Sequence, residues 1–231
     1  MVLLWKKKAH RLIINLACAP CKLLNREMYK IARKHKAPTI IYGTNIYEAV
    51  QIAPGISKKQ TVVRGGAQVA SVSRKIKSMF SLIASGAKLL IEFPVLVRYL
   101  WLGFKSSIMY ISPHTLYLSL RYPGIKTFNY FYDGRWDEAD CEKTLNELGW
   151  QRPPGCNTSW KADCSFDEIK NKMLHQTIGI TYADAFFSNM VRAGVISRQE
   201  AIQRIETEGK ISEQRLQEVQ DILELDAQFW D

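Results

Sequence analysis

The chain has 231 residues, 47% of them hydrophobic and 23% charged, which excludes an intrinsically disordered chain and allows a full buried core. A formal charge of +10 favours an anionic partner such as a nucleotide, a sugar nucleotide, RNA or the acidic face of a membrane. Five cysteines in a chain of this length exclude the dense disulfide framework of a small secreted domain and favour a reducing cytoplasm.

The N-terminal residues combine positive charges with a short apolar run. Lys6, Lys7, Lys8 and Arg11 precede residues 12–17, a run that contains Asn15 and is shorter than the core of a signal peptide. We therefore expect residues 12–17 to form a buried strand and the protein to be cytoplasmic.

A helix and a strand are expected directly after the cysteine pair Cys18-Ala-Pro-Cys21. Pro38 is expected to end the helix, and residues 39–42 are β-branched or aromatic, as in a buried strand of a parallel sheet. The apolar residues at helical spacing, expected to face the core, are Leu23, Leu24, Met28, Ile31 and Ala32.

The carboxyl end of that strand leads into the turn Gly43-Thr44-Asn45. Ligands of open α/β sheets bind at the carboxyl ends of the strands. We therefore expect this turn and the cysteine pair to face the same crevice.

Two central stretches give weaker signals. Residues 46–66 are typical of loops, and Gly65-Gly66 is interpreted as a plain turn because no acidic or hydroxyl partner follows at the spacing of a phosphate loop. Residues 71–104 mix basic and apolar residues, but Glu92, Pro94 and Arg98 interrupt any membrane-spanning run. Amphipathic helices covering the sheet or a subunit interface are expected there, with peripheral contact to an anionic membrane as the alternative.

Residues 128–132 concentrate aromatic side chains before a charged segment. Aromatic residues with polar tips line sugar and base sites as well as ordinary cores. A helix is expected after Asp137 and Glu138, with Cys141, Leu145 and Leu148 on a buried stripe and Gly149 as its stop.

Residues 151–165 form a proline-rich loop with two cysteines, Cys156 and Cys164. Loops this dense in polar and thiol groups often carry function. Cys18 and Cys21 have the spacing to share one metal ion, and Cys156 or Cys164 would add thiolates for a Zn²⁺ site or a [4Fe-4S] cluster. A redox pair or plain packing of the cysteines are the alternatives.

The remainder of the chain is expected to be helical. Ile169, Met173, Leu174 and Ile178 share one helical face, and His175 beside them is interpreted as a surface residue. A short helix is expected from Asn189 to Gly194. Ser197 and Glu200 have capping-box spacing, and two amphipathic helices separated at Gly209-Lys210 are expected to complete the chain.

Several motifs resemble the N-acetyl sugar amidotransferases of lipopolysaccharide and surface-polysaccharide biosynthesis, a branch of the PP-loop ATP pyrophosphatases. The resemblance is strongest from about residue 130 to residue 200. The motifs are Cys18-x-x-Cys21, Tyr42-Gly43-Thr44-Asn45, Phe131-Tyr132-Asp133-Gly134-Arg135-Trp136-Asp137-Glu138, Leu148-Gly149-Trp150, Thr158-Ser159-Trp160-Lys161-Ala162-Asp163-Cys164 and Ser188-Asn189-Met190-Val191-Arg192-Ala193-Gly194.

The resemblance implies an α/β fold: a partial Rossmann-like parallel sheet with a helical C-terminal region. Residues 1–130 would form an incomplete nucleotide-binding domain and residues 131–231 the helical region. The implied reaction is ATP-dependent amidation of a sugar carboxylate through an acyl-adenylate, with Mg²⁺, a sugar nucleotide as substrate, ammonia from a glutaminase partner, and a possible homo-oligomer. Gly43 and Asn45 would bind the nucleotide, and Lys161 and Asp163 the acyl substrate or pyrophosphate. By similarity to tRNA-thiolating members, Cys164 would join Cys18 and Cys21 as the metal ligands.

The sequence departs from this family in one respect. The Ser-Gly-Gly-x-Asp-Ser phosphate loop belongs upstream of the cysteine pair, where this sequence has only 17 residues. The expectation is therefore a gene fragment, or a chain inactive alone, with a non-catalytic metal-binding subunit as one alternative. The other alternative is tRNA thiolation, which suits the charge and the cysteines but lacks an evident RNA-binding appendage.

Overall fold

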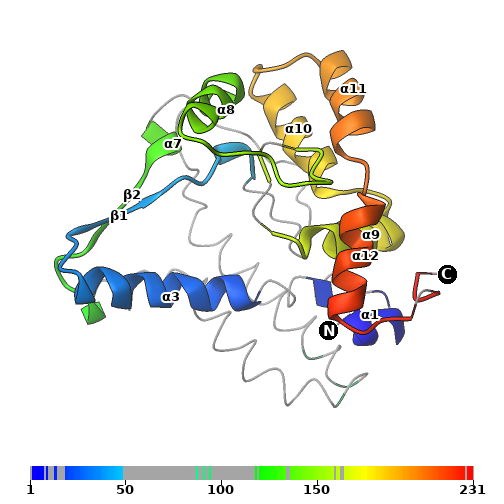
Figure 1. Cartoon of the computed structure of the whole chain (residues 1–231), viewed down its shortest axis with the longest axis horizontal. Coiled ribbons are helices and arrows are strands. Elements are labelled where there is room, and N and C mark those ends of the chain that lie inside the picture. Colours follow the sequence, from blue (N-terminus) through cyan, green and yellow to red (C-terminus); the bar gives the residue numbers. More distant parts are fainter. Residues whose placement is uncertain are drawn as a thin grey trace. The chain divides into compact units, whose positions relative to one another are not determined.

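The computed structural model (Figure 1) describes residues 2–7, 9, 13–14, 19–48, 87, 91, 94, 118, 120–133, 136–158, 160–161, 164–226 and 228–230. Two compact units make up the chain. The first unit comprises Met1–Thr44, Gln51–Gln60 and Ala67–Asp133, and the second comprises Asn45–Val50, Thr61–Gly66 and Gly134–Asp231. Gly43 and Asn45, close in the sequence, therefore belong to different units.

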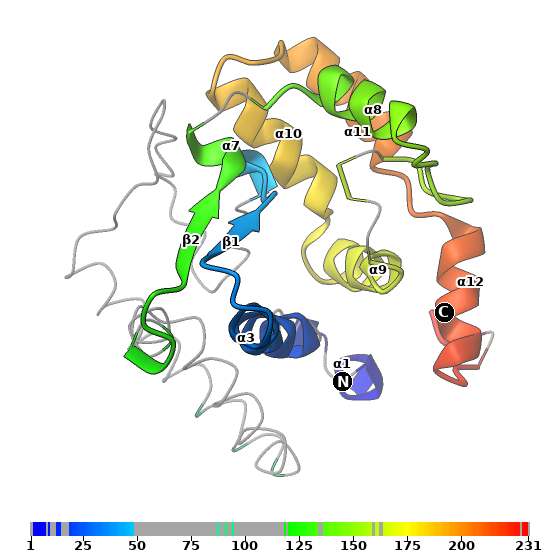
Figure 2. The same ribbon diagram turned by 60° about the vertical axis from the view of Figure 1, so that its left-hand side comes forward.

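The first unit contains two parallel strands. Its elements are α1 (Val2–Lys7), α3 (Ala19–Lys34), β1 (Thr39–Tyr42), β2 (Lys126–Asn129) and the single turn α7 (Tyr130–Asp133). β1 and β2 pair in parallel, with Thr39 opposite Lys126 and Tyr42 opposite Asn129. Figure 2 shows the two strands side by side and α3 seen end-on. The strand expected at residues 39–42 and its place in a parallel sheet are confirmed, but its expected burial is wrong except at Ile40, since Ile41 is 65% exposed.

The core of the first unit lies between α3 and β1. Tyr29 and Ala32 of α3 are buried with Ile40 of β1, and Leu118 and Tyr122 complete the cluster. The expected buried face of α3 is wrong in part, because Leu24 and Ile31 are 61% and 57% exposed. A helical period groups residues by face, but the neighbour that packs against the helix decides which face is buried.

α3 ends in a tight turn before Pro38 is reached. The amide of Lys36 donates to the carbonyl of Arg33, and the amide of Ala37 donates to the carbonyl of Ala32. This is the hydrogen-bond pattern of a Schellman motif, and Lys36 occupies its left-handed position with φ of 55°. The helix therefore ends at Lys34 through this motif, and Pro38 follows it.

The strand expected at residues 12–17 is wrong where the structure describes it. Ile13 and Ile14 have helical backbone, and both are fully buried. A short apolar run predicts burial well, but by itself it does not distinguish a strand from a buried helix.

The second unit is helical. Its elements are the 3-10 turn η1 (Ile46–Glu48), α8 (Glu138–Glu147), α9 (Asp167–Ile178), α10 (Tyr182–Arg192), α11 (Arg198–Glu208) and α12 (Glu213–Ile222). Helix α10 packs on α11 and on η1, and α9 packs on α12. With the small parallel sheet of the first unit, this confirms the α/β class and the helical C-terminal region.

Local hydrogen bonds fix where these helices start. Asp137 and Ser212 accept backbone amides at the starts of α8 and α12, and Ser197 accepts the Glu200 amide as expected. Thr181 and Asp184 form a reciprocal capping box at α10. α10 is longer than expected because this box starts it seven residues before Asn189. The break between the last two helices falls at residues 209–212, as expected.

Helix α8 corrects another expectation. It stops at the expected glycine, Gly149, which has φ of +85°, but it buries no residue. Cys141 is half-buried, and Leu145 and Leu148 are exposed. The apolar stripe is present in the sequence, but no described element covers it.

The face expected on α9 is confirmed, since Ile169, Met173 and Leu174 are buried and His175 is exposed. None of the helices that the structure describes has both the length and the apolar composition to cross a membrane. The expectations for residues 49–66 and 71–104 lie outside the described residues, apart from isolated positions.

Candidate functional site

Five aromatic side chains form a cluster in the second unit. Phe186 and Phe187 of α10 are fully buried at its centre. Trp160 stacks on Phe186 with ring centroids 4.0 Å apart and planes inclined by 5°. Tyr47 and Trp136 meet Phe186 edge to face at 6.3 and 5.9 Å. We call these residues, Tyr47, Trp136, Trp160, Phe186 and Phe187, the aromatic cluster.

The aromatic cluster brings together segments that are far apart in the sequence. Tyr47 follows the Gly43-Thr44-Asn45 turn. Trp136 comes from the motif of residues 131–138, and Trp160 comes from the motif of residues 158–164. Phe186 and Phe187 directly precede the motif from Ser188 to Gly194. Two motifs thus supply a ring each to the aromatic cluster, and the other three rings come from residues next to two further motifs.

Asn189 ties two of these segments together with a hydrogen bond. Its buried side-chain amide donates to the carbonyl of Tyr47 at 2.9 Å. Arg192 of the same motif donates to the side-chain oxygen of Asn189. The motif therefore fixes the backbone of η1 beside α10.

Asn45 has a buried donor that no described residue accepts. Its side chain is 2% exposed, and its Oδ1 accepts the Tyr47 amide at 2.8 Å. Within the part of the chain that is described, Nδ2 of Asn45 has no hydrogen-bond partner. Leaving a buried amide donor unsatisfied costs about 1–3 kcal/mol, so an acceptor brought by a ligand would remove a real penalty.

Gly43, the other residue expected to bind a nucleotide, lies in the first unit and is exposed. A Cβ added there would meet only the ring of Phe131, at an ordinary 3.9 Å. The geometry therefore gives no steric reason for glycine at this position.

Lys161, expected to bind the acyl substrate or pyrophosphate, already contacts an anion. Its Nζ lies 3.0 Å from Oδ1 of Asp167 and 3.7 Å from the ring centre of Tyr182. Oδ1 of Asp167 also lies 2.8 Å from Nζ of Lys170, and both contacts are ion pairs in which the carboxylate oxygen accepts no well-directed hydrogen bond. Two ammonium groups thus share one carboxylate at the start of α9. Asp163, expected to act with Lys161, lies outside the described residues.

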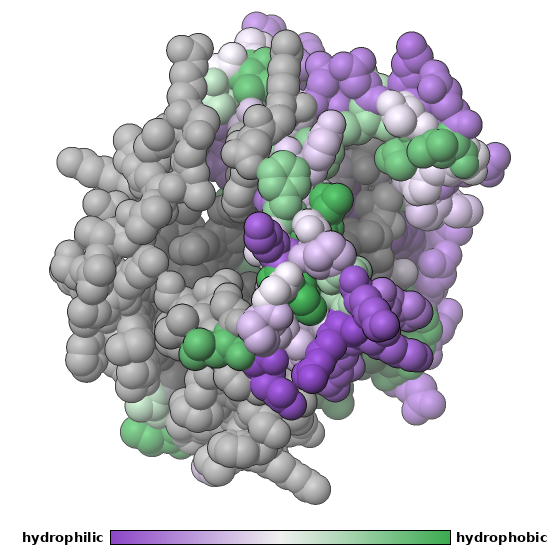
Figure 3. Space-filling model, turned by 90° about the vertical axis from the view of Figure 1, so that its left-hand side faces the viewer, coloured by the Kyte–Doolittle hydropathy of each residue, from purple (hydrophilic) through white to green (hydrophobic). Residues whose placement is uncertain are grey.

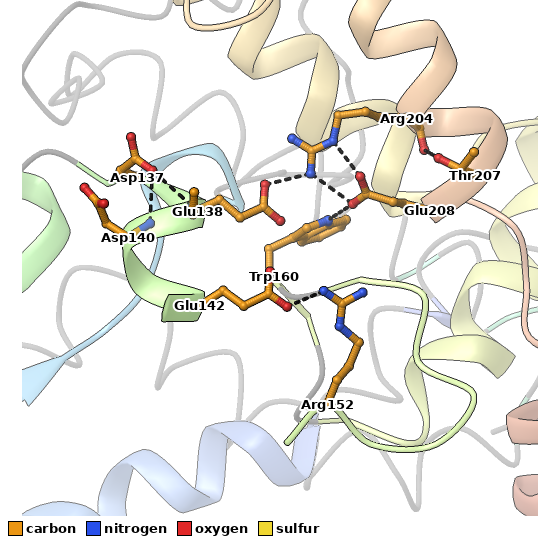
Figure 4. Close-up of polar contacts among 10 residues, drawn as sticks. Asp137, Glu138, Asp140, Glu142, Arg152, Trp160, Arg204, Thr207 and Glu208 are labelled. Atoms are coloured by element: carbon orange, nitrogen blue, oxygen red, sulfur yellow. Dashed lines mark hydrogen bonds and ion pairs between the residues drawn. The ribbon is translucent and has the colours of Figure 1, made fainter. Parts of the chain in front are cut away.

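An arginine links the aromatic cluster to α8 and α11 (Figure 4). Arg204 donates to Glu138 at 2.6 Å and to Glu208 at 2.5 and 3.0 Å. Glu208 also accepts the indole N–H of Trp160 at 3.2 Å. Burial acts to lower the pKa of Arg204, but the hydrogen bonds that it donates to Glu208 and Glu138 outweigh burial and raise that pKa. Arg204 therefore stays charged and holds Trp160 in place through Glu208.

A small recess lies beside this network. Its volume of about 20 Å³ holds one water molecule and no nucleotide. Gly209 is required there, because a Cβ would lie 2.5 Å from the carbonyl oxygen of Ile205. The recess is lined by Asn157, Thr158, Trp160, Lys161, Asp167, Glu168, Asn171, Ala183, Glu208, Gly209 and Lys210.

Glu168 lines the same recess, and its neighbours offset only part of the cost of burying its carboxylate charge. Its Oε2 accepts the Ser212 amide at 3.1 Å, and its Oε1 is 4.0 Å from Nη1 of Arg215. Burial raises the pKa of Glu168, the nearby Asp167 adds to that rise, and the Ser212 amide and Arg215 oppose it.

The expected metal ligands are only partly within the described structure. Cys18 lies outside the described residues, and of Cys21 only the backbone in α3 is described. Cys164 is half-buried, and its carbonyl accepts the Asp167 amide at 3.1 Å. Among the described residues there is no group of three cysteine, histidine or acidic side chains that could hold a metal. The expected approach of Cys18, Cys21 and Cys164 remains a prediction.

Cys156, the alternative third ligand, is buried with its thiol directed at backbone oxygens. Its Sγ donates to the carbonyl of Thr158 at 3.2 Å and lies 4.0 Å from that of Lys161. A thiol that donates to carbonyls is placed as a protonated group, whereas a metal ligand must be a thiolate.

Sequence reasoning missed two features of this site. Phe186 and Phe187 were not singled out, although an adjacent aromatic pair in a helix signals a large buried area. Arg204 and Glu208 lie in a tail that gave no functional signal, yet their spacing of four residues predicts a side-chain pair on one helix face.

No protein-family model, no curated protein and no solved structure was found to match this chain.

Proposed function

We propose that this chain is related to the N-acetyl sugar amidotransferases and takes part in the ATP-dependent amidation of a sugar carboxylate. The observation that carries the proposal is that Trp136 and Trp160, from two of the motifs, meet in the aromatic cluster, where Tyr47 is hydrogen-bonded to Asn189 of a third motif and to Asn45, whose buried donor is unsatisfied among the described residues. In the same proposal, β1 and β2 belong to a Rossmann-like sheet of the kind found in PP-loop ATP pyrophosphatases.

The proposed reaction has two steps. The sugar carboxylate attacks the α-phosphorus of Mg²⁺-bound ATP, and pyrophosphate leaves as the acyl-adenylate forms. Ammonia from a glutaminase partner then attacks the acyl carbon and displaces AMP. Adenylation is needed because a carboxylate is a poor electrophile, and the mixed anhydride formed with AMP gives its acyl carbon a good leaving group.

Asn45, Trp136 and Trp160 have distinct tasks in this proposal. The Nδ2 of Asn45 donates to an acceptor on the nucleotide, which satisfies its buried N–H. Trp136 and Trp160 are both partly exposed, so each can offer a ring surface to a sugar or a base.

Lys161 and Asp163 complete the proposed substrate contacts. Because Asp167 shares the charge of Lys161, we expect Lys161 to contribute less to binding an acyl or pyrophosphate anion than an unpaired lysine would. Cys18, Cys21 and Cys164 remain the proposed ligands of a Zn²⁺ ion or a [4Fe-4S] cluster, which would hold these segments together.

The test is calorimetric titration of the purified chain with two nucleotide-linked N-acetyl sugars, one carrying a carboxylate and one carrying a hydroxymethyl group in its place. We expect the carboxylate form to bind at least about tenfold more tightly, the effect of one charge-assisted hydrogen bond. Asn45→Ala should weaken binding of Mg²⁺-ATP, and the exposed Asn146→Ala on α8 serves as its matched control. Equal binding of both sugars, or none, would overturn the proposal, and co-purified RNA would favour tRNA thiolation instead.

The proposal also concerns pyrophosphate release. The 231 residues contain no Ser-Gly-Gly-x-Asp-Ser sequence, and each missing donor to a developing anion costs about a hundredfold to a thousandfold in rate. We therefore expect no AMP from ATP with the purified chain alone. Robust AMP production would show that the nucleotide site lies elsewhere in the chain.

A further inference from the structure

A cavity of about 620 Å³ opens at the amino ends of β1 and β2. It is bounded by the end of α3, by Ala37 and Pro38 before β1, and by residues 120–125 before β2. The turn Gly43-Thr44-Asn45 follows the opposite, carboxyl ends of the strands, where open α/β sheets bind their ligands. The cavity is therefore separate from the proposed nucleotide site.

Three basic side chains line this cavity: Arg33, Lys36 and Arg121. All three are exposed, and none of them forms an ion pair within the described part of the chain. The only acidic side chain described in the first unit is Glu27, which is 2.6 Å from Lys30. We call this concavity, with Arg33, Lys36 and Arg121 on its wall, the basic cavity.

The backbone at Lys36 fixes where its side chain lies. Lys36 has φ of 55° at the left-handed position of the Schellman motif, where glycine is the favoured residue. A lysine there strains the backbone. Glu224 has the same geometry, with φ of 52°, so the strain by itself does not mark a function, but at Lys36 it places a cation on the wall of the basic cavity.

The carbonyls at the end of α3 do not cancel this positive charge. The C-terminus of a helix carries partial negative charge on its unpaired carbonyls. Here the carbonyls of Ile31, Ala32 and Arg33 accept the amides of His35, Ala37 and Lys36. The cationic side chains therefore dominate the field in the cavity.

We propose that the basic cavity binds a small ligand with a diphosphate or two closely spaced phosphoryl groups. The guanidinium groups of Arg33 and Arg121 and the ammonium of Lys36 can donate to several phosphoryl oxygens at once. A guanidinium binds a phosphoryl group through two parallel hydrogen bonds. The volume is that of a small-molecule site. Figure 3 faces the end of the first unit where α3 stops, and hydrophilic side chains gather over part of that face.

The lining argues against single-stranded nucleic acid as the ligand. Such chains need a track of cations and exposed aromatic rings on which bases stack. The aromatic residue of the basic cavity, Tyr122, is buried and packs against Tyr29 with centroids 5.6 Å apart. Arg121 lies over Tyr122 at 5.9 Å, so this ring is covered on that side as well.

The test is titration of the purified chain with inorganic pyrophosphate, and a sedimentation assay with phosphatidylcholine vesicles that do or do not contain phosphatidic acid. Arg33→Ala and Arg121→Ala should each weaken pyrophosphate binding about tenfold. Lys34→Ala is the matched control, because Lys34 is an exposed cation in the same turn that does not line the cavity. Vesicle binding that pyrophosphate displaces would identify the source as a lipid headgroup, and pyrophosphate binding without vesicle binding would identify a soluble ligand.

Lys36→Gly separates loss of the ligand from loss of the fold. Glycine relieves the left-handed strain, so we expect Tm to rise by about 1–4 °C while pyrophosphate binding falls about tenfold. The proposal is overturned if pyrophosphate does not bind, if Lys34→Ala weakens binding as much as Arg33→Ala, or if RNA binds and pyrophosphate does not displace it.

Discussion

In the second unit Arg204, Lys161 and Arg152 each lie against a carboxylate, whereas in the first unit Arg33, Lys36 and Arg121 line a cavity to which no described residue adds a carboxylate. The sequence shows the same division. Residues 1–133 carry 21 lysines and arginines against four acidic residues, and residues 134–231 carry 11 against 18.

This difference separates two uses of positive charge. A cation held by a carboxylate in a partly buried network fixes neighbouring side chains, as Arg204 and Glu208 fix Trp160. A cation without a partner on an exposed wall adds little to stability and attracts an anion from solution. Residues 1–133 therefore carry a formal charge of +17 and residues 134–231 a formal charge of −7, so the positive charge of the chain bears on the partner of its first 133 residues only.

The largest effect should come from the centre of the aromatic cluster. Phe186→Ala removes a fully buried ring that contacts all four other members of the cluster, and we expect a loss of about 3–5 kcal/mol in the free energy of unfolding. Chemical denaturation followed by tryptophan fluorescence measures it. Phe128→Ala, on the 40% exposed ring in β2, should cost far less. Equal costs would show that the second unit lacks the core described above.

The two arginine ion pairs of the second unit should contribute unequally to the free energy of unfolding. Arg204→Met removes the guanidinium that pairs with both Glu138 and Glu208 in a partly buried network, and we expect it to cost about 2–3 kcal/mol. Arg152→Met breaks the more exposed pair with Glu142 and should cost under about 1 kcal/mol. Thermal unfolding of the two variants gives the comparison. A larger loss for Arg152→Met would contradict the positioning role of Arg204.

The pH dependence of stability tests how far the Ser212 amide and Arg215 offset the cost of burying the Glu168 carboxylate. Burial raises its pKa above the ordinary value of 4.5, so the folded state binds a proton more tightly than the unfolded state. The free energy of unfolding should therefore fall as pH rises from about 4.5 through the raised pKa, and stay lower above it. Glu168→Gln keeps an acceptor for the Ser212 amide and should flatten this part of the profile. An unchanged slope between pH 4 and about 7 would assign it to another group.

The smallest effect is a gain of stability in the first unit. Lys36→Gly should raise the free energy of unfolding by about 0.5–1 kcal/mol, because it relieves a left-handed non-glycine residue. Lys36→Ala keeps the strain and removes the same charge, so it should give no gain. Differential scanning calorimetry of both variants distinguishes strain from charge. A gain with alanine would mean that repulsion among the cations, and not the backbone, limits stability there.

The sequence predicted several of the points where helices and strands begin and end, because local chemistry sets them. The strand at residues 39–42, the Ser197 cap and the break near Gly209 depend on residues within one turn or one strand, and the structure has all three. The resemblance also picked out segments that meet at the aromatic cluster, although nothing in their spacing said that Tyr47 and Trp160 would share Phe186 as a neighbour.

Tertiary structure alone decided which helix faces are buried and which cations pair with a carboxylate. Tyr29 and not Leu24 faces the core of the first unit, and the apolar stripe of α8 stays uncovered, because a period along a helix does not name the partner that packs on it. Lys161 pairs with Asp167 six residues on, and Arg204 with Glu138 sixty-six residues back. Coulomb attraction depends on distance in space and on burial. The sequence shows which residues are charged, but only the tertiary structure determines which cations pair with a carboxylate and which can bind a ligand.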